Sequence, residues 1–68
     1  MTSKQKVLAR YPDADHLSRR MMGVTFYVIV ESPNRRMVIG EAIGSAGKAW
    51  TDARKNMEAG KPLYPLSR

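Results

Sequence analysis

The sequence contains no cysteine and only one histidine, His16. Without cysteine the chain can form neither a disulfide nor a thiolate zinc site, and one histidine with scattered carboxylates does not build a metal site. We therefore expect no metal and no cofactor. A chain of 68 residues is small, and such a chain buries only about 60% of the surface that its unfolded form exposes. We expect good packing or self-association to compensate for its thin core.

Long hydrophobic runs are also missing. The longest apolar stretch, Val24 to Val30, is far too short to span a bilayer, and the polar first residues do not resemble a secretory leader. These features predict a cytoplasmic protein that has no membrane partner.

Groups that could carry out catalysis are few. His16 has no partners that would complete a triad, although Ser18 is two positions away, and Asp13 and Asp15 follow Pro12 in a segment typical of a turn. A domain this small also has little volume for a pocket that excludes water. We expect no enzymatic activity and no small-molecule substrate.

Positive charge is in excess. Lysine and arginine outnumber aspartate and glutamate by 12 to 6, which gives a net charge of +6. Such an excess is typical of nucleic-acid-binding proteins. It is equally compatible with a protein that docks on an acidic partner and with one that is simply soluble, because net charge governs association rather than fold.

The first half of the chain predicts one short helix and two strands. Thr2 and Gln5 have the spacing of a capping box, and the helix should span residues 3–10 because Pro12 disfavours helix at the residue before it. Residues 16–21 alternate as a strand would, although a loop or a helical turn also fits them. Residues 24–30, rich in β-branched and aromatic side chains, form the clearest strand.

A third strand is expected over residues 36–42, after a turn. A two-residue turn would place Val30 opposite Met37 and Val28 opposite Ile39, and we prefer this register because it pairs apolar residues with one another. Pro33 argues against it, since proline cannot supply the positive φ of the favoured two-residue turns. A three-residue turn would reverse the face of every residue in the third strand.

Residues 45–59 have the strongest helical pattern of the chain. Apolar residues recur at the spacing of an amphipathic helix, at Ala46, Ala49, Trp50, Ala53 and Met57, and Gly60 is suited to end it. The expected fold class is α+β with two layers: a short N-terminal helix, a two- to three-stranded antiparallel sheet and a C-terminal amphipathic helix packed on one face. Residues 1–60 would form this single domain, and residues 61–68, with two prolines, an extended tail.

The middle strand is apolar on both faces, so one face remains once the long helix is placed. We expect Trp50 to be the centre of the core and to lie across Phe26, Val28, Val30 and Ile39. The remaining face would carry Tyr27, Ile29 and Val38, with Arg20 and Arg36 beside them. Either the first helix or the tail covers this face, or it forms an exposed apolar patch rimmed by arginine, which is typical of protein interfaces.

The sequence therefore predicts a small non-enzymatic binding protein whose open sheet face engages another protein or a second copy of the chain. The alternative is sequence-nonspecific binding of RNA or DNA by basic residues that would contact phosphates, namely Arg35, Arg36, Lys48 and Lys55.

The order helix–strand–strand–strand–helix in a short basic chain resembles the double-stranded-RNA-binding domain over residues 3–59. In that family a lysine cluster at the start of the second helix contacts phosphates, whereas residues 45–50 here contain only Lys48. The loop that enters the minor groove in that family is reduced here to Met22 and Gly23. The resemblance therefore implies the scaffold and not the RNA-binding surface. Residues 11–14 and 49–53 also resemble small phage and prophage proteins, which implies an accessory or modulator role toward a host protein.

Overall fold

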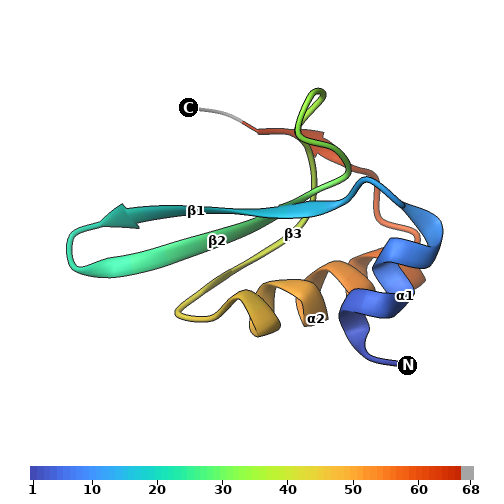
Figure 1. Cartoon of the computed structure of the whole chain (residues 1–68), viewed down its shortest axis with the longest axis horizontal. Helices are drawn as coiled ribbons and strands as arrows, with labels where there is room; N and C mark the ends of the chain where they lie inside the picture. The colour runs from blue at the N-terminus through green and yellow to red at the C-terminus, as the bar shows by residue number, and fades with distance from the viewer. Residues whose placement is uncertain (67–68) are drawn as a thin grey trace.

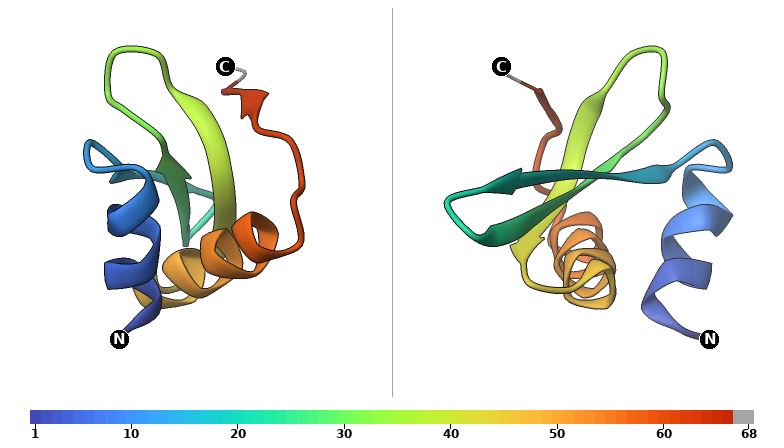
Figure 2. Two further views of the ribbon diagram at one scale, coloured as in Figure 1. Left: turned by 90° about the vertical axis from the view of Figure 1, so that its right-hand side faces the viewer. Right: turned by 60° about the vertical axis from the view of Figure 1, so that its left-hand side comes forward.

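The computed structural model describes residues 1–66 and shows an α+β fold, as predicted. Its elements follow one another as α1 (Ser3–Arg10), β1 (Asp15–Met21), β2 (Val24–Val30), β3 (Met37–Ile43), α2 (Ala46–Glu58) and β4 (Tyr64–Pro65). The strands form one antiparallel sheet in the order β1-β2-β3-β4. Both helices lie on the same side of this sheet (Figures 1 and 2), so no helix within residues 1–66 covers the other side.

The helix ends follow from local sequence. The Thr2 side chain accepts a hydrogen bond from Gln5 N–H while the Gln5 side chain accepts one from Thr2 N–H, which confirms the capping box at the start of α1. Ser45 caps α2 by accepting a hydrogen bond from Lys48 N–H on its side-chain oxygen. At the end of α2, Gly60 has a φ of 73°, and such a left-handed residue is the usual helix terminator.

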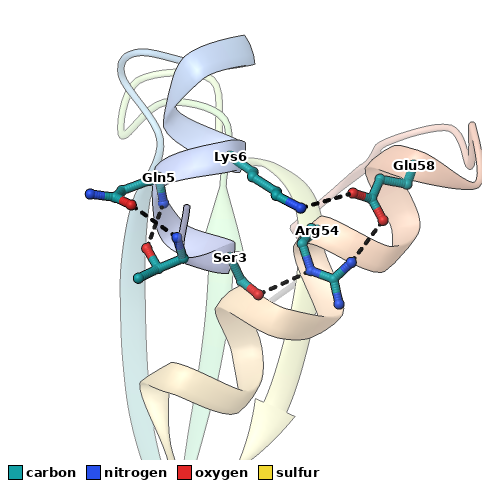
Figure 3. A network of polar contacts seen from close by, with 6 residues as sticks. Ser3, Gln5, Lys6, Arg54 and Glu58 are labelled. Atoms are coloured by element: carbon teal, nitrogen blue, oxygen red, sulfur yellow. Dashed lines mark hydrogen bonds and ion pairs between the residues drawn. The ribbon is translucent and has the colours of Figure 1, made fainter.

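Polar side chains join the two helices (Figure 3). Arg54 donates from Nε to Ser3 Oγ at 3.0 Å and from Nη1 to Glu58 Oε1 at 2.7 Å. Lys6 Nζ lies 4.0 Å from the other oxygen of Glu58. Arg54 is half-buried and makes two of these contacts, so it orients α1 against α2, whereas the more exposed Lys6 pair adds little stability.

The β1–β2 hairpin is regular and confirms the strand interpretation of residues 16–21. Its two-residue turn has Met22 at φ 50° and Gly23 at φ 82°, the pattern of a type I′ turn that matches the twist of the flanking strands. The pairing runs without a register shift from Met21↔Val24 to Asp15↔Val30. The hairpin extends past the start of α2 (Figure 1).

The preferred register of β2 and β3 is wrong. Val30 pairs with Val38 and not with Met37, and after a register shift Val28 pairs with Glu41 and not with Ile39. The cause is the turn: it is longer than two residues, Arg36 N–H closes it on the Ser32 carbonyl at 2.9 Å, and Arg36 adopts a φ of 56°. Pro33 lies inside this turn, where no positive φ is required of it.

The two faces of β2 are also the reverse of the prediction. Ile29 is fully buried in the core beside Ile39 and Trp50, and Tyr27 packs against the same cluster. Phe26, Val28 and Val30 therefore point to the helix-free side, because successive side chains of a strand alternate between faces. Trp50 does belong to the core, where the prediction placed it.

The tail contributes a short strand that the prediction did not include. Tyr64 pairs with Val38, and Pro65 pairs with Met37. The proline is tolerated here because β4 is an edge strand. Residues 67 and 68, which belong to the predicted tail, lie outside the described residues.

Helix α2 lies directly on β3 because Gly40 has no side chain. A Cβ atom at Gly40 would lie 2.6 Å from Ala53 Cα and 2.9 Å from the carbonyl carbon of Asp52. On the helix, Ala49 and Ala53 are fully buried. Small residues on both elements thus set the distance between helix and sheet.

We predict that Gly40→Ala destabilises the domain by about 2–4 kcal/mol, because the new methyl group would overlap the α2 backbone. Gly47→Ala is the matched control: its Cβ would meet only Ser45 Oγ, at 3.4 Å, and alanine stabilises a helix relative to glycine by roughly 1 kcal/mol. Urea unfolding of both variants measures the two changes. A Gly40→Ala variant as stable as the wild type would contradict the close approach of α2 to β3.

Candidate protein-binding surface

The helix-free face of the sheet is largely apolar. Residues that pair across antiparallel strands lie on the same face, so the pairs Leu17↔Val28, Arg19↔Phe26, Met21↔Val24 and Phe26↔Ile43 place all these side chains together. Arg19 is the one charged member of this set, and the acidic Asp15 and Glu41 lie on the same face, opposite Val30 and Val28. The two ends of the face differ in how far they are covered.

The end of the face next to the β2–β3 turn is closed. Val30 is 0% and Val38 1% exposed, and Leu66 N–H donates to the Arg36 carbonyl at 3.0 Å, which holds the tail beside the turn. Between this closed end and β1 lies a hollow of about 300 Å³. Its lining residues are Leu17, Ser18, Arg19, Phe26, Arg36 and Leu66.

The other end of the face, at the β1–β2 hairpin, is open. Met21 is 47%, Val24 49% and Ile43 58% exposed, and Met22 in the turn is fully exposed. We call these four residues the hairpin patch. Among residues 1–66 only two other large apolar side chains, Met1 and Tyr64, are exposed. The exposed apolar surface is therefore concentrated at the hairpin, in the part of the chain that projects from the body of the domain (Figures 1 and 2).

The structure does not bring the predicted face residues together on an open surface. Ile29 is buried beneath the helices and Tyr27 is half-buried there, so their placement on the open face is wrong. Arg20 is exposed but pairs with Thr25, on the helix side. Val38 does lie on the helix-free face but is covered. Of the five, Arg36 alone borders the hollow.

Sequence reasoning missed the hairpin patch although the chain carries a signal for it. Turn positions favour Gly, Asn, Asp and Ser, yet the residue before Gly23 in the turn is Met22, which follows a second methionine, Met21. A large apolar side chain in a turn has no core to enter. A methionine in this turn is therefore the sequence signal that predicts an exposed apolar surface at this end of the sheet.

The basic residues proposed for nucleic acid are not gathered on one surface. Arg35 and Arg36 belong to the β2–β3 turn, and Lys48 and Lys55 belong to α2, which lies at the opposite side of the domain (Figures 1 and 2). Arg35 Nε also lies 3.4 Å from a carboxylate oxygen of Glu31.

The two lysines of this set lie in a mixed-charge environment. Lys48 and Lys55 line a shallow groove together with Glu41 and Asp52. The carboxylates would oppose phosphate there.

Tyr64 fastens the tail to the helix-free side of β3. Its hydroxyl donates a hydrogen bond to a Glu41 carboxylate oxygen. Partial burial, followed by this hydrogen bond and by the negative charges of Glu41 and Asp52, raises the pKa of the Tyr64 phenol to about 12. The neutral phenol is the form that the folded state favours.

We predict that the hydrogen bond between Tyr64 and Glu41 is lost at high pH. The pKa of Tyr64 is raised above its ordinary value of 10.0, so its contribution to stability is fully present below pH 10 and is lost as the pH rises through about 12. Absorbance of tyrosinate near 295 nm should show a step at about pH 12 that Tyr64→Phe removes and that the control Tyr11→Phe retains. A step unaffected by Tyr64→Phe would show that the Glu41 contact does not form.

Comparisons with known proteins add no identity. No family model, curated protein or solved structure matches the chain. Within residues 1–66, no helix has the length and apolar character that crossing a membrane requires. The chemistry of the surfaces is therefore what indicates a function.

Proposed function

We propose that the chain is a non-enzymatic binding protein that docks through the hairpin patch and the adjoining Phe26 on an apolar surface of another protein. The observation that carries this proposal is the concentration of exposed large apolar side chains at one end of a helix-free sheet face. Water-exposed apolar clusters bordered by polar residues are typical of protein interaction sites. Methionine and aromatic residues are enriched in such sites.

The backbone at Met22 supports the same proposal. A residue other than glycine in the left-handed region costs free energy, and only Asn and Asp adopt it at low cost. Met22 adopts it at φ 50° while its side chain is fully exposed, so neither the turn nor the core benefits from methionine at this position. Unfavourable local choices of this kind cluster at binding sites.

The charged neighbours of the patch indicate the chemistry of the partner. Arg19 lies beside Phe26 on the same face, and Arg20 follows it on the helix side. Arg36 lies farther away, at the β2–β3 turn, where it borders the hollow. All three are exposed. We infer a partner whose apolar surface is edged by carboxylates, because complementary charge steers association and excludes other partners. A phage-type accessory or modulator protein acting on a host protein would work in this way.

Sequence-nonspecific nucleic-acid binding is favoured less. It would need Arg35, Arg36, Lys48 and Lys55 to contact one backbone, and these residues come from opposite sides of the domain (Figure 1).

The double variant Val24→Thr/Ile43→Thr should abolish capture of the partner without unfolding the domain. Both side chains are about half exposed, and threonine is favoured in strands, so we expect the free energy of unfolding to change by less than about 1 kcal/mol. Capture from a nuclease-treated lysate by immobilised wild type and variant, followed by mass spectrometry, measures the effect. The proposal fails if a folded variant retains the same bound proteins.

Met22→Asn should change stability and binding in opposite directions. Asparagine is preferred before glycine in a type I′ turn, so we expect a gain of about 0.5–1 kcal/mol in stability, whereas loss of the exposed methionine should weaken capture. Thermal unfolding and the same capture assay measure the two effects. Because the variant is expected to be more stable, reduced capture could not be ascribed to unfolding, and undiminished capture would exclude Met22 from the interface.

A further inference from the structure

The two edges of the sheet differ in how far other parts of the chain cover them. Along β3, β4 pairs with Met37 and Val38, the Asn56 side chain donates to the Ile39 carbonyl at 2.9 Å, and the Asp52 carboxylate accepts from Glu41 N–H at 3.0 Å. The edge of β3 is therefore covered by a strand and by two side chains of α2. The opposite edge is formed by β1, and six of its seven residues are exposed.

The backbone groups that β1 turns outward follow from the hairpin geometry. In a hairpin with a two-residue type I′ turn, the pair next to the turn exchanges both hydrogen bonds, and every second pair does so after it. Met21 and Val24 are that pair, so the even-numbered residues of β1 direct N–H and C=O away from β2. The bond from His16 N–H to its neighbour Asp15 Oδ1 at 2.8 Å agrees with this direction.

We infer that β1 is the pairing edge of a symmetric dimer, in which β1 of a second copy adds in antiparallel orientation about a two-fold axis at Leu17. In every register with such an axis, odd-numbered residues of one β1 lie opposite odd-numbered residues of the other, and even-numbered residues lie opposite even-numbered ones. Opposed side chains therefore always share a face of the sheet. The dimer uses the edge of β1, whereas the proposed docking uses the hairpin patch on the sheet face. Arg19 borders both surfaces.

Charge selects the register of this dimer. With Leu17 opposite Leu17, Asp15 of each copy lies opposite Arg19 of the other, and His16 lies opposite Ser18. The two Asp15–Arg19 pairs occupy positions without backbone hydrogen bonds, where opposed side chains approach most closely. Moving the axis to Ser18 would place Asp15 opposite Met21 and Leu17 opposite Arg19, which loses both charge pairs and the apolar contact.

The edge residues also explain why other strands would pair poorly. Charged side chains, proline and bulges are the usual protection of an edge strand. Strand β1 has neither proline nor a register shift and relies on Arg19, Arg20 and Asp15. In the dimer, the Asp15 carboxylate pairs with Arg19 of the other copy and no longer accepts from His16 N–H. The Ser18 carbonyl of the other copy accepts from His16 N–H instead.

The dimer would also enlarge the proposed docking surface. A two-fold axis perpendicular to the sheet places both helix-free faces on the same side. The half-buried Leu17 of each copy then joins Phe26 and Val28 of both copies in one continuous apolar face.

Charge exchange between the two positions tests the inference. Sedimentation equilibrium of the whole chain over a concentration series should show a monomer–dimer equilibrium. Arg19→Asp or Asp15→Arg alone should weaken it by about tenfold or more, because each creates two like-charge pairs. The double variant Asp15→Arg/Arg19→Asp should recover the wild-type dissociation constant, and an equimolar mixture of the two single variants should form a heterodimer.

A second variant blocks the edge without touching charge. The Ser18 N–H points away from β2, so Ser18→Pro removes an outward donor and leaves the β1–β2 ladder complete. We expect at least about tenfold weaker dimerisation, with Ser18→Thr as the control that dimerises normally.

Several results would overturn the inference: a wild type that stays monomeric throughout the series, a dimer indifferent to both the charge exchange and Ser18→Pro, or a dimer abolished by Val24→Thr/Ile43→Thr. The last result would place self-association on the hairpin patch. Loss of partner capture in that variant with an intact dimer would support the two surfaces separately, so failure of one proposal is distinguishable from failure of the other.

Discussion

The contact between Gly40 and the backbone of Ala53 is the constraint on which the rest of this domain depends. Because no side chain separates β3 from α2 at this point, the helix lies close enough for two of its polar side chains to reach the sheet edge. Asp52 and Asn56 then bond backbone groups of β3 that no strand pairs. One close approach thus closes a face and an edge of the sheet together.

This packing leaves the opposite face of the sheet and the edge of β1 without helical cover. Helix α1 adds Val7 to the same core and is held against α2 by Arg54, so all helical cover is on one side. The tail closes only the end of the opposite side near the β2–β3 turn, through Leu66. An open face at the hairpin and an open edge at β1 remain, and the two proposals concern these two surfaces.

Local structure was predictable wherever a single segment decides it. Helix α1, with its Thr2 cap, and helix α2, between Ser45 and Gly60, were placed correctly because capping and periodicity are properties of neighbouring residues. The faces of β2 were not, because a strand that is apolar on both sides has no alternation to orient it. The predicted site is wrong for the same reason. It contained Ile29, which is buried under the helices, whereas Phe26 and Val28 are the residues of β2 that lie on the helix-free face.

The sequence by itself determined the α+β class, both helices, the hairpin turn at Gly23 and the net charge of +6. Only the tertiary structure decided which side of β2 the helices cover, how β3 is registered against it and which edge stays bare. These depend on the long turn ending at Arg36 and on the fit of α2 over Gly40. Both bring together residues distant in the chain, and their energies arise only when those residues meet.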